Sequence, residues 1–364
     1  MDTELQMTYG CIMQAVCVED VFGDLKGDKE KVNRTAKKIY YRLSMVVHPD
    51  KNVDDKEMAN EAFVRLSEFY ERAQKKIQQG TYGQRIENKN DKGIGFVIKT
   101  RKQEYVISST LAEGDLSVVY GGNCVGSDDF AGQIAVKIFG DVVDNRLAQN
   151  EIKVLELLQS EPSNQNKHLP VLLDKFKTTN GQLGTILRQI DGCDIYSIRE
   201  KYKDGVDGKH MVWMLNRLLS VLGYVHSKGI IHGNIEPGHF MIRPKDHNGW
   251  LIDWCYAAVN PARSGDRFKV YNEDFSAPEV KEQKSPIPAS DLYSVGKLMI
   301  YVLGGDVKTN TMPSTVEDKL QRFIKFFVRE SPIQRAQDAW EMHAQLSELI
   351  IELWGPKKFL ELKI

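Results

Sequence analysis

The sequence of 364 residues lacks the features that mark secreted, redox-active or membrane proteins. Its five cysteines are scattered and form no Cys-x-x-Cys pair, which argues against zinc ribbons and thioredoxin-like motifs and favours reduced thiols. The first residues show neither the charged start nor the apolar core of a signal peptide. No stretch approaches about 18 consecutive apolar residues, so a spanning helix is not expected. These absences predict a cytoplasmic protein with no membrane partner.

An excess of charge of one sign is also lacking. The chain has 49 basic and 50 acidic residues, a net charge of −1, so nothing attracts it as a whole to nucleic acid and no such partner is expected. Its apolar fraction of 41% and charged fraction of 27% are ordinary for a globular protein. This length predicts two domains, or three small ones.

Residues 1–78 predict an all-helical domain. A short apolar helix is expected over residues 11–22, and apolar side chains at helical spacing predict longer helices over residues 31–47 and about 55–77. Two such helices joined by a tight loop make a helical hairpin. The polar face of the first long helix is basic, with Lys31, Arg34, Lys37, Lys38 and Arg42.

The loop of this hairpin has the sequence His-Pro-Asp-Lys-Asn, from His48 to Asn52. Pro49 ends the preceding helix because proline disfavours the helical conformation of the residue before it. The loop, the basic helix before it and Ala62-Phe63-x-x-Leu66 after it together resemble the J-domain, a co-chaperone module that stimulates the ATPase of Hsp70. One departure is Val46-Val47, where that family usually has a Lys-Tyr-like pair, and this reduces the basic patch.

The J-domain resemblance implies an Hsp70 partner, approached by attraction between a basic patch and an acidic surface. The residues that it assigns to Hsp70 binding are His48, Pro49, Asp50, Lys37, Lys38 and Arg42. The alternative is that the proline only stops a helix and that the charges only solvate its surface. No Gly/Phe-rich or cysteine-rich module follows, so the expected helical domain is joined to something else.

Residues 79–95 are polar without an apolar period and predict a flexible linker. Residues 96–190 then predict a small β-rich lobe, with strands near residues 96–98, 105–107 and 134–139. A further strand over residues 184–190 would lead into a hinge at Asp191-Gly192.

Two patterns in this lobe resemble protein kinases. Ile134-Ala135-Val136-Lys137 is similar to the Val-Ala-Ile-Lys strand, whose lysine holds ATP phosphates, and Glu151 on the following helix falls where the kinase glutamate pairs with that lysine. Residues 111–120 are similar to the Gly-rich loop over the phosphates. Only Gly114 of its three glycines is present, so a looser cover is expected, because backbone approaches phosphate most closely at glycine.

Residues 191–358 predict a helical lobe, including a long amphipathic helix over residues 211–226. His232-Gly233-Asn234 lies where kinases have the His-Arg-Asp of the catalytic loop, and Asp253 lies where they have the metal-binding Asp-Phe-Gly. Three further residues resemble the structural markers of the fold: Asp291, which would brace the catalytic loop, and Glu279 and Arg335, which would form a buried ion pair. The resemblance implies an α+β protein in which a bilobal kinase-like domain follows the helical one.

The residues that carry kinase chemistry are altered. Asn234, Glu236 and His239 stand where kinases have the catalytic aspartate, the phosphate-binding lysine and the second metal ligand, and His232 precedes them. An amide cannot act as a base, and Mg²⁺ prefers oxygen to imidazole. The residues that would hold a nucleotide persist: Gly114, Lys137, Glu151 and, as the metal ligand, Asp253. ATP and Mg²⁺ are therefore the expected cofactors of a pseudokinase, and His239 has either a role of its own or a structural one.

Three hypotheses follow from the sequence. The first is an Hsp70 co-chaperone adaptor whose pseudokinase domain recruits a client protein. The second is a divergent ATP-dependent phosphotransferase that uses Lys137, Glu151, Asp253 and His239. The third is a scaffold that binds no nucleotide.

Overall fold

The computed structural model describes residues 3–14, 18–23, 25–52, 55–80, 82, 95–114, 116–125, 133–160, 165–356 and 358–364. The chain divides into two compact units, Met1–Asp91 and Lys92–Ile364. Most of the predicted linker over residues 79–95 lies outside the described residues. The lobe boundary predicted after residue 190 falls between two strands of the second unit, β6 (Leu183–Arg188) and β7 (Cys193–Asp194).

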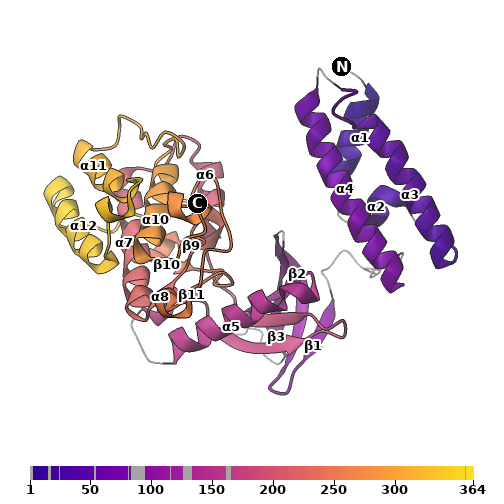
Figure 1. Ribbon diagram of the computed structural model, residues 1–364. Coiled ribbons are helices and arrows are strands. Elements are labelled where there is room, and N and C mark those ends of the chain that lie inside the picture. Colours follow the sequence, from indigo (N-terminus) through magenta and orange to yellow (C-terminus); the bar gives the residue numbers. More distant parts are fainter. Residues whose placement is uncertain are drawn as a thin grey trace. The chain divides into compact units, whose positions relative to one another are not determined.

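The first unit is helical, as predicted, but its first helix is placed differently (Figure 1). The helix expected over residues 11–22 has the wrong start, because α1 (Thr3–Gln14) begins eight residues earlier; the short α2 (Val18–Phe22) lies in the rest of the expected range, and residues 15–17 lie outside the described residues. The two long helices are α3 (Lys29–Val46) and α4 (Lys56–Gln79), and they pack against each other. The core of this unit contains Leu5, Ile12, Val18, Phe22, Val47, Ala59, Ala62, Leu66, Phe69 and Ala73.

Local capping defines the hairpin between α3 and α4. The Asp28 side chain accepts a hydrogen bond from Lys31 N at 2.8 Å, which satisfies one of the free amides at the start of α3. At the other end, the Asn52 side-chain amide donates to Val46 O at 2.8 Å and to His48 O at 2.9 Å. These bonds close the His-Pro-Asp loop onto the end of α3.

The second unit begins with an antiparallel sheet of six strands in the order β1-β2-β3-β4-β6-β5. Each strand expected from the sequence is present, although the last one ends two residues earlier, at Arg188. Helix α5 (Asn145–Gln159) packs on β5 and β6. The strand bounds are β1 Phe96–Lys99, β2 Glu104–Glu113, β3 Ser117–Cys124, β4 Gln133–Phe139, β5 Leu172–Lys177 and β6 Leu183–Arg188.

The rest of this unit is mainly helical and is built around α7 (Gly208–Ser227). Short strands pair in the orders β10-β9-β7 and β11-β8, and they carry the loops that hold the site. The other helices are α6 Ile195–Lys201, α8 Pro261–Ser264, α9 Pro278–Lys281, α10 Pro288–Val302, α11 Asp318–Phe327 and α12 Ala339–Trp354. The short strands are β7 Cys193–Asp194, β8 Ile230–Ile231, β9 Phe240–Arg243, β10 Asn248–Leu251 and β11 Ala258–Val259.

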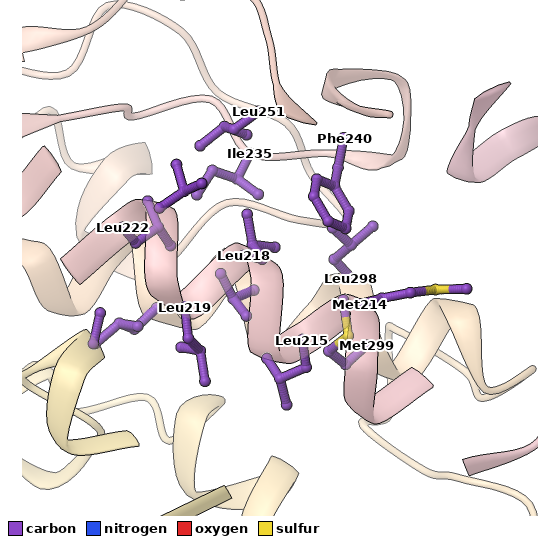
Figure 2. Packing of buried hydrophobic residues seen from close by; sticks show 14 of the residues in the cluster. Met214, Leu215, Leu218, Leu219, Leu222, Ile235, Phe240, Leu251, Leu298 and Met299 are labelled. Carbon is purple, nitrogen blue, oxygen red and sulfur yellow. The ribbon is translucent and has the colours of Figure 1, made fainter. Parts of the chain in front are cut away.

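The apolar core of the helical part surrounds α7. Figure 2 shows the α7 side chains of Leu215, Leu218 and Leu222 among buried residues from the loops and from α10. Ile235 and Leu251, which flank the two functional loops, belong to the same core and are fully or almost fully buried. The burial of such side chains is worth roughly 1.5–3 kcal/mol each, so the core fixes the positions of both loops.

The predicted ion pair between Glu279 and Arg335 is present in the interior. Arg335 donates to Glu279 Oε2 at 2.7 Å and to Glu330 O at 2.9 Å, and Ser290 Oγ donates to Glu279 Oε1 at 2.6 Å. Both charged side chains are almost fully buried. Removing one partner would leave the other as a buried, uncompensated charge.

We therefore expect Glu279→Gln to lower the free energy of unfolding by about 3–5 kcal/mol, because Arg335 would keep its buried charge. Equilibrium denaturation in urea measures this difference. Glu156→Gln is the matched control, since it removes an exposed ion pair with Lys175, and it should leave stability nearly unchanged. Equal effects of the two variants would contradict the assignment of a buried structural pair.

Candidate functional site

Three elements bring one lysine and two carboxylates together. Lys137 lies on β4, Glu151 on α5, and Asp253 in the loop after β10. Lys137 Nζ donates to Asp253 Oδ1 at 2.7 Å and to Glu151 Oε1 at 3.3 Å. The side chains of Lys137 and Glu151 are only 7% and 2% exposed. The ion pair expected between these two residues is therefore present, and Asp253 shares the same ammonium group.

The charges of this cluster support one another. Burial alone would lower the pKa of Lys137, but the negative charges of Glu151 and Asp253 raise it above its ordinary value. Burial alone would raise the pKa of Asp253, but the nearby Lys137 lowers it below its ordinary value. Lys137 is therefore charged and Asp253 ionised. Burial raises the pKa of Glu151 above its ordinary value, although Lys137 and the backbone N–H of Trp254 oppose this rise.

The loop that presents Asp253 is locked from both sides. Asp253 has a positive φ of 63°, a conformation that only a minority of non-glycine residues adopt. Behind it, Trp254 is fully buried and its indole donates to Leu251 O at 3.0 Å. The Asn150 amide of α5 donates to Cys255 O at 3.0 Å and to Ala257 O at 2.8 Å. These contacts connect the loop to the helix that carries Glu151.

The catalytic-like loop is braced by Asp291 on α10, as expected. Its carboxylate is 1% exposed and accepts the backbone N–H groups of His232 and Gly233, each at 2.8 Å. The His226 ring lies 2.9 Å from the same carboxylate. Gly233 has a φ of 76°, a conformation that glycine adopts at little cost, so the position of the usual arginine is filled by a residue suited to the turn.

Asn234, Glu236 and His239 come together on this loop, next to Asp253. His239 Nδ1 lies 2.8 Å from Asn234 O, and its Nε2 lies 3.4 Å from Asp253 Oδ2 and 3.5 Å from Glu236 Oε1. The other oxygen of Glu236 accepts a hydrogen bond from the Asn272 side chain at 2.5 Å. Each replacement for a kinase residue therefore has a defined position beside Asp253.

The turn between β2 and β3 carries Gly114. Gly114 N donates to Ser117 O at 2.9 Å, while Asp115 lies outside the described residues. A Cβ atom at Gly114 would meet Ser117 O at 3.5 Å, which is an ordinary contact. Glycine is thus not required by the turn itself, and its proposed role over phosphates stays a prediction.

The His-Pro-Asp loop of the first unit is also well formed. The His48 ring packs edge-on against Phe63 with centroids 5.3 Å apart, and His48 Nδ1 accepts Asp50 N at 3.2 Å. The Lys37 ammonium lies 5.9 Å from the centroid of the Tyr41 ring. The side chains of His48 and Asp50 are 43% and 84% exposed. None of these contacts bears on a binding partner. The roles in Hsp70 binding therefore stay predictions for all six residues: His48, Pro49, Asp50, Lys37, Lys38 and Arg42.

Sequence patterns missed three residues of the site. Asn150 connects α5 to the Asp253 loop, His226 contacts Asp291, and Asn272 contacts Glu236. The partners of Asn150 and His226 lie 65 or more residues away, and that of Asn272 lies 36 residues away. No spacing rule connects positions so far apart, and only a complete kinase template would have indicated them.

The side chains of the site fit a metal ion that is bound together with a nucleotide. In the part of the chain that the structure describes, no group of three or more His, Cys, Asp or Glu side chains converges to hold an ion alone. Asp253 contacts Lys137 through Oδ1, while its Oδ2 lies 3.4 Å from His239 Nε2, so the two oxygens have different neighbours. Kinase-type Mg²⁺ sites use few protein ligands and complete their coordination with phosphate oxygens and water.

Comparison with known proteins agrees with this geometry. The chain belongs to the protein kinase domain family, whose match covers residues 105–357. Members of this family generally bind ATP and Mg²⁺. The chain is therefore a kinase-like protein with a β-rich lobe followed by a helical lobe.

Its relatives include several protein kinases. Serine/threonine-protein kinase D of Synechocystis is 27% identical over 227 residues, 56% of this chain and 42% of that protein. Serine/threonine-protein kinase PknA of Nostoc is 29% identical over 163 residues, 43% of this chain and 28% of that protein. Casein kinase II subunit alpha' of Saccharomyces cerevisiae is 23% identical over 201 residues, 55% of this chain and 56% of that protein. The chain therefore spans less than two thirds of each of these relatives.

These findings correct the first hypothesis. The predicted function as an Hsp70 co-chaperone adaptor is wrong, because the family match covers the kinase-like unit and the relatives are named serine/threonine kinases. The second hypothesis, a divergent phosphotransferase, fits better. The match begins at residue 105 and so assigns no family to the N-terminal helices. Within the described residues, no helix is long and apolar enough to cross a bilayer.

The buried His232 predicts how stability depends on pH. Burial lowers the pKa of His232 to about 4, and its ring lies between Ile252 O, at 3.0 Å from Nε2, and the buried Trp254. Below the unfolded value of about 6.5, the unfolded chain gains a proton that the folded chain does not. The contribution of His232 to the free energy of unfolding is therefore complete above about pH 6.5. It is lost progressively toward pH 4, by about 3 kcal/mol in all.

Urea denaturation between pH 7 and pH 4.5 measures this loss. His168, whose pKa burial also lowers to about 4, adds to the slope and remains in the His232→Gln variant. The variant should therefore show a shallower slope than the wild type, and parallel slopes would refute the assignment to His232.

Proposed function

We propose that this protein is a divergent ATP-dependent phosphotransferase that transfers phosphate to a serine or threonine hydroxyl of a protein. The observation that carries the proposal is Lys137, whose ammonium contacts both Glu151 and Asp253. In active kinases this lysine–glutamate pair and the metal-binding aspartate must be in place together. The class of acceptor is taken from the names of the relatives, which are serine/threonine kinases.

Each residue of the cluster has a separate role in this proposal. Lys137 would move from Asp253 to the α- and β-phosphates, while Glu151 holds its amine in position. Asp253 Oδ2 would hold the metal ion, which neutralises charge on the phosphates. Because the transition state of phosphoryl transfer is loose, positioning and electrostatic stabilisation supply most of the catalysis.

The acceptor side of the site explains why transfer should be slow. Asn234 occupies the place of the general base, and its amide cannot accept the hydroxyl proton. A missing base costs about 10²–10⁴ in rate. Glu236 also brings negative charge where kinases have a lysine. The expected enzyme binds ATP in the usual way and transfers phosphate at a low rate.

Hydrogen bonds, rather than a phosphorylated side chain, hold the segment after Asp253 in place. The Asn272 amide donates to Glu236 Oε2 at 2.5 Å, and its Oδ1 accepts Asp274 N at 3.0 Å. Residues 256–275 contain no threonine, and Gly233 replaces the arginine that binds a phosphorylated loop in many kinases. These features support an acceptor site that is ordered independently of phosphorylation.

Transfer of labelled γ-phosphate from ATP, to the protein itself or to a casein mixture, tests the proposal. We expect slow incorporation that Asp253→Ala abolishes, because the metal ligand is lost. Asp318→Ala, at an exposed aspartate of α11, should keep the wild-type rate. Clean binding of Mg·ATP by a thermal shift without any transfer, or full transfer by Asp253→Ala, would overturn the proposal. Ligand at 100 times its Kd adds about 2.7 kcal/mol of stability, so binding is detectable.

Restoring the base provides a second test. We expect Asn234→Asp to raise the turnover number by up to about 10²–10⁴, with little change in the affinity for ATP, because the carboxylate acts on the acceptor hydroxyl. Steady-state kinetics with a peptide acceptor separates the two parameters. An unchanged turnover number would show that Asn234 does not occupy the position of the base.

A further inference from the structure

His239 has a defined tautomer. Its Nδ1 lies 2.8 Å from the backbone oxygen of Asn234, and because a carbonyl oxygen only accepts hydrogen bonds, Nδ1 carries the proton. With Nδ1 occupied by this hydrogen bond, Nε2 is the ring nitrogen that is placed to bind a metal ion. Metal-binding histidines commonly have this arrangement, in which one ring nitrogen donates to a carbonyl group and the other is left for the ion.

The free nitrogen of His239 faces two carboxylates. Nε2 lies 3.4 Å from Asp253 Oδ2 and 3.5 Å from Glu236 Oε1, and the side chains of the three residues are between 16% and 24% exposed. Both distances exceed the roughly 2.7–3.2 Å of a good N–H···O bond. The negative charge of the two carboxylates favours a cation at this mostly buried place.

The two oxygens of Asp253 have separate partners. Oδ1 accepts Lys137 Nζ at 2.7 Å, and Oδ2 faces His239. Glu236 is held by Asn272 through Oε2, and its Oε1 adds negative charge near the same ring nitrogen. One nitrogen and one carboxylate oxygen therefore point at the same place, next to the lysine that would hold the phosphates.

We propose that His239 Nε2 and Asp253 Oδ2 together bind one divalent cation when a nucleotide is present, and that the imidazole makes the site select Mn²⁺ or another first-row transition ion over Mg²⁺. The proposal rests on the phosphotransferase function above. Mg²⁺ is hard and prefers oxygen ligands, whereas transition ions accept imidazole readily. With only two protein ligands, phosphate oxygens and water must complete the coordination, so binding depends on nucleotide.

The direct test detects the nitrogen ligand. The full chain is labelled with ¹⁵N at histidine and mixed with Mn²⁺ and AMP-PCP, an ATP analogue without a bridging nitrogen. Pulsed electron paramagnetic resonance should then show a ¹⁵N coupling on the bound Mn²⁺. His239→Asn, which replaces the nitrogen ligand by an amide oxygen, should abolish the coupling. His343→Gln removes one histidine of α12 and should leave it unchanged.

Metal preference gives a second measurement. The Kd of AMP-PCP is determined by titration with Mn²⁺ and with Mg²⁺, and the wild type should favour Mn²⁺. Loss of the nitrogen ligand should reduce this preference by about tenfold or more, because even the loss of a residue that only supports a metal ligand costs about 10–100-fold in affinity.

The outcomes separate this inference from the proposed function. Tight binding of the Mn²⁺ complex without a histidine coupling, or equal metal preference in wild type and His239→Asn, overturns the inference and leaves the phosphotransferase proposal intact. Failure of the wild type to bind AMP-PCP with either metal overturns both. A coupling that persists in His239→Asn would assign the metal to another histidine and also overturns the inference.

Discussion

The structure of the site depends on one ammonium group that the buried Glu151 and the partly buried Asp253 share. Lys137 comes from a strand, Glu151 from a helix 14 residues later, and Asp253 from a loop 116 residues away. In the low dielectric of the interior, either carboxylate without Lys137 would be a costly unpaired charge. The ammonium group therefore fixes three elements of the kinase-like unit relative to one another. The same contacts leave Asp253 Oδ2 free to face the catalytic-like loop.

The catalytic-like loop combines an intact frame with altered chemistry. Asp291 holds its backbone through the N–H groups of His232 and Gly233, and the apolar core around α7 buries Ile235. Because the frame depends on backbone bonds and apolar packing, the polar side chains on it can change without loss of the fold. Asn234, Glu236 and His239 are such changes. They alter the base, the charge at the phosphate and the metal ligand, and so they affect rate and metal choice more than architecture.

The N-terminal hairpin shows how a strong local pattern can mislead about function. The periods of α3 and α4 and the stop at Pro49 were predictable because they depend on neighbours in the chain. The loop pattern, however, suggested a co-chaperone function for the whole protein, and the family match to residues 105–357 favours phosphotransfer instead. The expected start of the first helix at residue 11 was wrong for a related reason. Apolar composition alone did not show where α1 ends and α2 begins.

The sequence by itself indicated a helical part before a kinase-like part, several of the strands and helices, and the residue types at the kinase positions. Helical and strand periods and short motifs depend on local chemistry, so Lys137, Glu151, Asp253 and the Glu279–Arg335 pair could be found by position. Only the tertiary structure decided that His239 Nε2 faces Asp253, that Asn272 holds Glu236, and that Asn150 secures the Asp253 loop. These contacts join residues that are distant in the chain, and their geometry depends on how the core packs rather than on any local pattern.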